Sequence, residues 1–205
     1  MLSSFIFLGV LELKPSWAQS LIKTIDVGNG PLDIVYNPFN KYIYVANGLS
    51  DDVSVIDGAT SKIIKTIDVG DYPTRLLYNP SNLAIYVANS NSNGVSVINS
   101  VTNTVIKTMT VGDNPWKLQH SPADNRVYVA NFNSNDVSVI NGAANKVIKT
   151  IPVGSGPWDL VYNHSNKRIY SANIWSDTVS VISTSTIIIG QAPNSPDDLK
   201  PIAVH

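Results

Sequence analysis

Four charged side chains recur at equivalent places in the chain, each two residues after a proline. They are Asp33, Arg75, Lys117 and Asp159, and the step between successive members is always 42 residues. If the segments that carry them surround a common axis, these side chains meet near one mouth of a channel and can hold a polar ligand or an ion. We favour a different interpretation, in which salt bridges between them neutralise the charges and set the order of the segments.

Three of the four tryptophans lie at two sets of loops. One set contains Val-Gly-x-x-Pro and the other follows each Tyr-x-Ala-Asn, and both connect strands at the same end of the predicted structure. This loop face carries the following candidate binding residues: Asp33, Tyr72, Arg75, Trp116, Lys117, Phe132, Trp158, Asp159 and Trp175. Exposed aromatic rings beside a few charges suit contacts with a glycan or a peptide. The competing interpretation is that the tryptophans pack between neighbouring units, since burial is the commoner fate of aromatic side chains.

The sequence contains no recognisable catalytic or metal-binding pattern. Its histidines, His120, His164 and His205, share no metal-ligand spacing. The lack of cysteine removes thiolate ligands, disulfides and cysteine nucleophiles. Loops rich in Asn and Asp, such as 47–52 and 131–136, could offer oxygen ligands to calcium, but turn formation explains them without a metal. We therefore predict no catalytic residues, no metal site and no cofactor.

The charge balance bears on the kind of partner. The formal net charge is -1 and the isoelectric point is about 6.2. Proteins that bind nucleic acid or an anionic membrane surface usually carry a basic patch or stripe. This sequence has no such basic segment, so we predict a protein or glycan partner and no nucleic acid.

A repeat of 42 residues organises the positions described above. It is marked by glycines and prolines, by an asparagine at the end of a strand and by a valine that opens the next strand. The marker positions are Gly28, Gly70, Gly112 and Gly154; Pro31, Pro73, Pro115 and Pro157; Asn47, Asn89, Asn131 and Asn173; and Val53, Val95, Val137 and Val179. A fixed period of this length is the signature of a repeat architecture.

Each repeat contains four short segments rich in β-branched and aromatic residues, separated by Asn, Asp, Gly and Pro. Four antiparallel strands in about 40 residues match a blade of a β-propeller. We therefore predict an all-β fold, a propeller of four-stranded antiparallel blades spanning residues 19–189. The repeat units are approximately 28–69, 70–111, 112–153 and 154–189.

The two ends of the repeat array bear on ring closure. Residues 19–27 match the last strand of a repeat, whereas the fourth unit has a shortened last segment, 184–189. We predict that the N-terminal strand pairs with the last blade as its outer strand and closes a four-bladed ring. The alternative is an open, partial propeller, which would self-associate. Residues 190–205 are predicted to be a proline-rich tail.

The repeats also carry a family resemblance. Tyr44-Val45-Ala46-Asn47 and its copies at 86–89, 128–131 and 170–173 resemble the signature of the YVTN-type β-propeller repeat family, as do the Val-Gly-x-x-Pro, Asn-Pro-x-Asn and Val-Ser-Val-Ile elements. The resemblance covers residues 21 to about 182. It implies a propeller of the kind often found on archaeal or bacterial cell surfaces and in surface-layer-like proteins, and it implies no single activity.

The N-terminus resembles a secretory signal. Residues 2–11 are almost wholly apolar, and small residues stand at Ser16 and Ala18. We predict a signal peptide at 1–18, an extracytoplasmic location and no transmembrane span in the mature chain. The expected function is a non-catalytic, secreted or cell-surface module that binds or scaffolds a partner at the cell envelope. The alternatives are a fragment of a quinoprotein or haem d1-like propeller enzyme and a purely structural surface-layer spacer.

Overall fold

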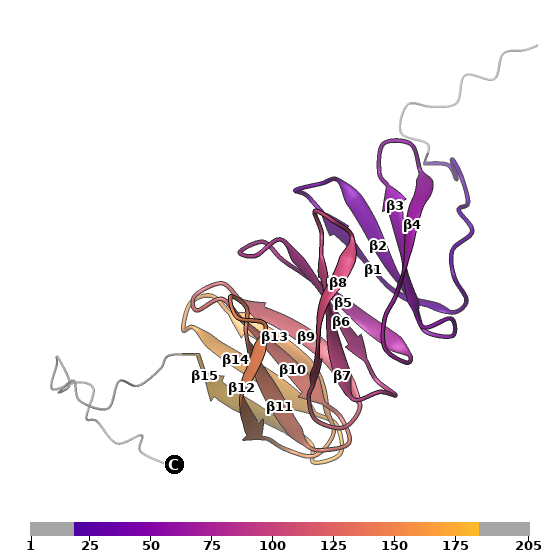
Figure 1. The fold of residues 1–205 in the computed structure, drawn as a ribbon. Helices are drawn as coiled ribbons and strands as arrows, with labels where there is room; N and C mark the ends of the chain where they lie inside the picture. The colour runs from indigo at the N-terminus through magenta and orange to yellow at the C-terminus, as the bar shows by residue number, and fades with distance from the viewer. Residues whose placement is uncertain (1–18, 185–205) are drawn as a thin grey trace, which may run out of the picture.

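The computed structural model of the chain describes residues 19–184. These residues form fifteen β-strands, arranged as separate antiparallel sheets that follow one another along an arc (Figure 1). We call the sheets blades 1 to 4. Blades 1 to 3 have four strands each, and the described part of blade 4 has three. The predicted propeller blades are therefore confirmed.

The strands of each blade follow one another as a meander. Blade 1 contains β1 (Pro31–Asn37), β2 (Tyr42–Asn47), β3 (Asp52–Asp57) and β4 (Lys62–Asp68); blade 2 contains β5 (Pro73–Asn79), β6 (Ala84–Asn89), β7 (Gly94–Asn99) and β8 (Thr104–Thr110); blade 3 contains β9 (Pro115–Ser121), β10 (Arg126–Asn131), β11 (Asp136–Asn141) and β12 (Lys146–Pro152); and blade 4 contains β13 (Pro157–Asn163), β14 (Arg168–Asn173) and β15 (Thr178–Ser183). The first strands of the blades, β1, β5, β9 and β13, lie beside one another on the inner side of the arc.

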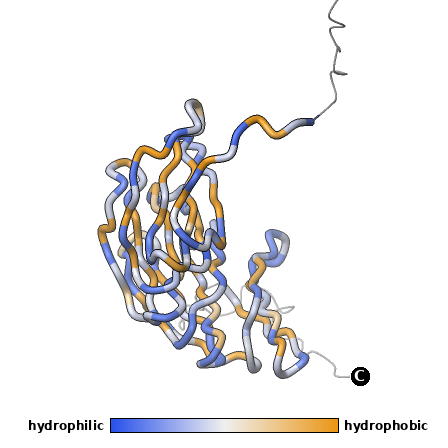
Figure 2. Tube along the Cα trace, turned by 90° about the vertical axis from the view of Figure 1, so that its right-hand side faces the viewer, coloured by the Kyte–Doolittle hydropathy of each residue, from blue (hydrophilic) through white to orange (hydrophobic). Residues whose placement is uncertain are grey.

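The core lies between the blades, because successive residues of a strand point to opposite faces and the second strands are apolar on both faces. In β6, Ile85 and Val87 join the core shared with blade 1, whereas Tyr86 and Ala88 join the core shared with blade 3. Hydrophobic segments run through the sheets in this way (Figure 2). In each junction, the second and third strands of one blade contribute tyrosine, alanine and valine. The next blade contributes a leucine from its first strand and aliphatic residues from its second and third strands. At the junction of blades 1 and 2 these buried residues are Tyr44, Ala46, Val53, Val55 and Ile67 on one side and Leu76, Ile85, Val87 and Ile98 on the other.

The same contact set recurs at the other two junctions. Between blades 2 and 3, Tyr86, Val95 and Val97 pack with Leu118 and Ile140. Between blades 3 and 4, residues of the same types in β10 and β11 meet Leu160, Ile169 and Ile182. The 42-residue repeat therefore encodes one interblade interface used three times.

The arc is open. β1 packs against β5 and β13 packs against β9, so blade 1 and blade 4 stand at opposite ends (Figure 1). Residues 19–27 belong to no sheet and run along blade 1, where Lys23 Nζ donates a hydrogen bond to the carbonyl oxygen of Ser61 at 2.6 Å. The predicted pairing of this segment with blade 4 is not made in this structure, and closure of a single-chain ring stays a prediction.

Three predictions fall outside the described residues. They are the signal peptide at 1–18, the tail at 190–205, and all but the first residue of the shortened segment 184–189. Within residues 19–184, no helix has the length and apolar character needed to cross a membrane.

Candidate aromatic binding face

The two loop sets predicted to share one face touch each other in every blade. The backbone N–H of Ser90 donates to the carbonyl oxygen of Tyr72 at 3.0 Å, and that of Phe132 donates to Asn114 at 2.9 Å. Ile174 makes the same bond to Gly156 at 2.9 Å. The loop that enters each blade is thus tied to the loop after its second strand, and the side chains of both are presented together.

In each blade, a β-bulge turns the residue that follows the repeat proline out of the strand ladder. The register shifts between Pro157 and Asp159 in blade 4, and at the equivalent place in the other blades. A bulge leaves its extra residue unpaired and redirects the side chain. In blades 3 and 4 the extra residues are Trp116 and Trp158, so both indoles leave the inner strands at the loop face.

These two indoles form the centre of a continuous aromatic cluster. The ring centroids of Trp116 and Trp158 are 4.7 Å apart with an interplanar angle of 30°. Phe132 meets Trp158 edge-on at 5.6 Å and contacts Trp175 at 4.3 Å. The guanidinium of Arg75 lies 5.2 Å from the centre of the Trp116 ring, within the range of a cation–π contact. Five of the nine predicted site residues are therefore in one contact chain across blades 2 to 4.

Burial within this cluster is uneven. Trp116 and Phe132 are half-buried, as expected for residues that pack between blades. Trp158 is 40% exposed and Trp175 is 58% exposed. The burial of Trp116 and Phe132 fits the interblade-packing interpretation, whereas a binding role for the exposed Trp158 and Trp175 stays a prediction.

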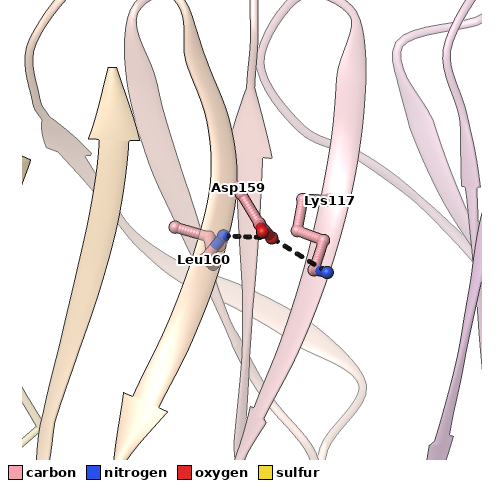
Figure 3. A network of polar contacts seen from close by, with 3 residues as sticks. All are labelled: Lys117, Asp159 and Leu160. Carbon is pink, nitrogen blue, oxygen red and sulfur yellow. Dashed lines mark hydrogen bonds and ion pairs between the residues drawn. The ribbon is translucent and has the colours of Figure 1, made fainter. Parts of the chain in front are cut away.

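The four charged residues at equivalent positions do not all pair with one another. Lys117 Nζ lies 2.9 Å from Asp159 Oδ1, and the same oxygen accepts a hydrogen bond from the Leu160 N–H at 2.8 Å (Figure 3). Asp33 instead accepts from the backbone N–H of Leu76 at 2.7 Å, in the next blade. Arg75 donates to the carbonyl oxygen of Thr74 at 2.8 Å. Mutual neutralisation therefore describes the Lys117–Asp159 pair, whereas Asp33 ties blade 1 to the backbone of blade 2.

Asp33, Arg75 and Lys117 also share a shallow pocket of about 350 Å³ on the inner strands, whose floor includes Leu76 and Leu118. Tyr72 stands apart from both groups. It has a left-handed backbone (φ 54°), and its N–H donates to Asp51 Oδ1 at 2.8 Å. Its ring lies close to Gly48, at the junction of blades 1 and 2. The predicted residues thus form an aromatic cluster, a charged inner row and one separate tyrosine.

Sequence reasoning missed three exposed apolar residues of this face. Leu32 is 42% exposed, Leu49 is 72% exposed and Ile174 is 48% exposed. Leu32 occupies the repeat position of Trp116 and Trp158, and Leu49 occupies that of Trp175. The repeat alignment alone could have identified the two leucines, had aliphatic residues been considered with the aromatic ones.

Burial lowers the pKa of His120, although Asn125 and Asp124 act in the opposite direction. No group of three or more His, Cys, Asp and Glu side chains that could hold a metal ion occurs among residues 19–184.

The antiparallel meanders are arranged radially and pack face to face through their inner strands. This arrangement defines the protein as a β-propeller protein. The family model for YNCE-like beta-propellers matches residues 35–126. No curated protein gives a significant match.

Two solved structures illustrate the similarity of fold. One is hydrazine synthase of Kuenenia stuttgartiensis, with a TM-score of 0.62 and 22% identity over 82% of this chain and 53% of that chain. The other, from Bacteroides uniformis ATCC 8492, is described as a "putative 6-phosphogluconolactonase", with a TM-score of 0.64 and 16% identity over 74% of this chain and 49% of that chain. The chain therefore spans about half the length of these structures, and at these identities the likeness concerns the fold.

Proposed function

We propose that this β-propeller protein is a non-catalytic binding module, secreted or held at the cell surface, that takes a glycan or protein partner on its loop face. The observation that carries the proposal is the exposure of Trp158 and Trp175 at the end of an otherwise packed aromatic cluster. Exposed tryptophans offer a flat apolar face for stacking and an indole N–H for hydrogen bonding.

The partner contact would be built on a rigid support. Trp158 packs against Trp116 and Phe132, and Trp116 is in turn covered by the guanidinium of Arg75. Rings that are already fixed lose little conformational entropy when a ligand stacks on them. The Lys117–Asp159 pair beside Trp158 adds a polar edge that can select among partners by hydrogen bonding.

The test is a titration of the purified protein with neutral oligosaccharides based on glucose, galactose, mannose and N-acetylglucosamine, followed by intrinsic tryptophan emission. Three of the four tryptophans in the chain lie in the cluster, so stacking should change the emission. We expect Trp175→Ala to weaken binding by about tenfold or more, equivalent to a lost contact of about 1.4 kcal/mol.

The matched control is Phe39→Ala, which removes an aromatic ring that is 57% exposed in the turn between β1 and β2, away from the loop face. It should leave binding unchanged. If folded Trp175→Ala and Trp158→Ala proteins bind every oligosaccharide as the native protein does, the glycan form of the proposal is wrong. Capture of an envelope protein that depends on the same two tryptophans would support the protein form.

The extracytoplasmic location is proposed from the signal-like residues 1–18. Its test is the N-terminal sequence of the protein recovered from culture medium and envelope. A mature chain that begins near Gln19 supports export, and an intact Met1 in a cytosolic fraction contradicts it.

An enzyme fragment is the second candidate, because the two similar structures carry the names of enzymes. It predicts that native material holds a chromophore or turns over a lactone substrate. A visible absorption spectrum and a 6-phosphogluconolactone hydrolysis assay, both made on the protein as purified, test it directly.

A further inference from the structure

The end of the arc at blade 4 exposes the same kind of surface that every other blade buries. Val179 and Val181 of β15 are 63% and 51% exposed, whereas the equivalent Val95 and Val97 of blade 2 are fully buried. Tyr170 is only half-buried, although its equivalents Tyr44 and Tyr86 have no exposed surface. These residues and Val161 and Ala172, which border a small apolar pocket, form what we call the blade 4 end face.

The opposite end of the arc exposes the matching surface. Ile34 of β1 is 64% exposed, whereas its equivalents Leu76, Leu118 and Leu160 are at most 8% exposed. Tyr36 is 54% exposed and its equivalent Tyr162 only 5%. We call Ile34, Tyr36 and Ile43 the blade 1 end face. In each internal junction, the leucine at the position of Ile34 packs against the valines at the positions of Val179 and Val181.

We propose that the blade 4 end face of one copy of this chain docks on the blade 1 end face of a second copy, and that two such junctions close a ring of two chains. Three internal junctions with the same residue types show what covers each of these faces. A two-fold axis makes both new junctions identical. Two copies of four blades give eight blades, the upper end of the common range for propellers.

The edge of β15 provides a second, independent indication. In blades 1 to 3 a fourth strand covers the equivalent edge, whereas β15 borders a groove of about 560 Å³ whose other wall includes Lys149 and Ile151 of β12. A strand edge left unpaired beside a groove readily accepts an added strand.

Residues 19–27 are suited to fill this groove in the second copy. Lys23-Thr24-Ile25-Asp26-Val27-Gly28 is identical to residues 65–70 at the end of β4. The segment also enters blade 1 as β4 enters blade 2, because Asn29 N donates to Ser50 Oγ at 3.0 Å as Asp71 N does to Ser92 Oγ. It therefore lies beside blade 1 where the fourth strand of a preceding blade would lie. Among residues 19–184, β15 is the third strand that has no fourth strand beside it, so β15 of a second copy can supply the matching edge.

The ring would also extend the loop face across the new junction. Leu32 and Leu49 of the second copy would lie next to the Trp158 and Trp175 end of the aromatic cluster, since they hold the equivalent repeat positions. The exposed apolar residues of the loop face would then form one continuous band over each junction.

The first test is the mass of the purified full chain in solution, measured by light scattering during size-exclusion chromatography. We expect twice the single-chain mass found by mass spectrometry. A single-chain mass at micromolar concentration overturns the proposal.

Disulfide trapping then distinguishes the two-chain ring from a ring closed within one chain. Ser54 faces Thr66 across β3 and β4, so the equivalent pair in the proposed junction is Ser180 and Thr24. The chain has no cysteine, so the double variant S180C/T24C introduces the only thiols. Oxidation of the double variant should give a disulfide-linked dimer that a reducing agent separates into single chains. Neither single variant should form the disulfide between positions 24 and 180, because each lacks one of the two thiols. A link within one chain would overturn the proposal in favour of single-chain closure.

Charge placed on the end faces provides the matched variants. Val179→Asp and Ile34→Lys alter side chains that are exposed in the single chain, so each blade should fold normally. Each should reduce the particle to a single-chain mass. The control is Val101→Asp, at a residue of similar exposure (62%) in the turn between β7 and β8, and it should remain two-chain. A two-chain mass for both end-face variants would also overturn the proposal.

Discussion

The hydroxyl of Tyr86 in blade 2 donates a hydrogen bond to Asn145 Oδ1 in blade 3 at 2.6 Å. The same hydroxyl accepts a bond from Asn82 Nδ2 at 2.9 Å, in the turn before its own strand. Tyr44 makes the same two contacts one repeat earlier, with Asn103 and Asn40. In blades 1 and 2, the tyrosine of the Tyr-Val-Ala-Asn motif therefore joins a turn of its own blade to a turn of the next blade through its hydroxyl. Its ring is fully buried.

The first prediction concerns this polar link. Tyr86→Phe keeps the ring and removes the hydroxyl, which leaves the half-buried Asn145 Oδ1 with only the longer bond of 3.4 Å from Asn82 Nδ2. We expect the free energy of unfolding to fall by about 1 kcal/mol, the usual net contribution of one hydrogen bond. Urea unfolding followed by circular dichroism measures it. Tyr170→Phe is the control, because the Tyr170 hydroxyl contacts Asn166 at an exposed site; an equal loss in both variants would contradict the interpretation.

The second prediction concerns alkaline pH. Burial, with a smaller contribution from the carboxylate of Asp124, raises the pKa of Tyr128 to about 12 from an ordinary value of 10.0. Below pH 10 the phenol is neutral in both states and stability is unaffected. Between pH 10 and about 12 the unfolded chain loses this proton and the folded chain keeps it, so the free energy of unfolding falls.

At about 1.4 kcal/mol per pH unit, the loss for Tyr128 approaches about 3 kcal/mol at the top of this range. Burial also raises the pKa values of Tyr44 and Tyr86, which adds to the effect. Tyrosinate absorbance and urea midpoints measured across the range test the prediction. Tyr128→Phe should show a smaller alkaline loss than the native protein, and an identical pH profile would count against it.

The third prediction explains the glycine that opens each repeat. A Cβ at Gly70 would lie 2.5 Å from Ser92 Oγ and 2.8 Å from Asn89 Nδ2, both of which hold the loop in place. We expect Gly70→Ala to destabilise the protein by about 1–3 kcal/mol through overpacking. Gly94→Ala in the same blade is the control, since its nearest neighbour would be the Met109 carbonyl oxygen at 3.3 Å. Thermal unfolding of the two variants should differ clearly, and equal melting temperatures would refute the steric explanation.

The fourth prediction separates the roles of Asp159. Its Oδ1 accepts from both Lys117 Nζ and the Leu160 N–H. The ion pair is exposed and should contribute at most about 1 kcal/mol. Asp159→Asn keeps an oxygen for the backbone bond, so its effect on stability should be within about 0.5 kcal/mol and independent of salt, whereas Asp159→Ala should cost more. Chemical unfolding at low and high salt provides the measurement, and a large loss for Asp159→Asn would show that the charge itself matters.

The repeat predicted the blades well, because each side chain of the interblade core occurs at a fixed position in every unit. Tyr86 and Leu118 each recur at steps of 42 residues, so the contact that they make repeats at the other junctions. The loop face followed from strand alternation for the same reason.

The contacts among site residues were harder to predict. The sequence suggested pairing among Asp33, Arg75, Lys117 and Asp159, but the Asp33 carboxylate accepts a hydrogen bond from the Leu76 N–H of the next blade, and Arg75 donates to the carbonyl oxygen of Thr74. The stack of Trp116 on Trp158 depends on the angle between two blades, which no local pattern encodes. The course of residues 19–27 along blade 1 likewise depends on contacts between segments rather than on the strand-like composition of those residues.

The repeated interface also has a genetic consequence. Because each blade presents the same two surfaces, a duplicated segment of 42 residues would insert between its neighbours without requiring a single compensating substitution. Unequal recombination between the repeats can therefore lengthen or shorten the array in whole blades, while the reading frame and the hydrophobic core are both preserved. The number of blades that such a gene encodes can therefore change without any substitution at the interblade junctions.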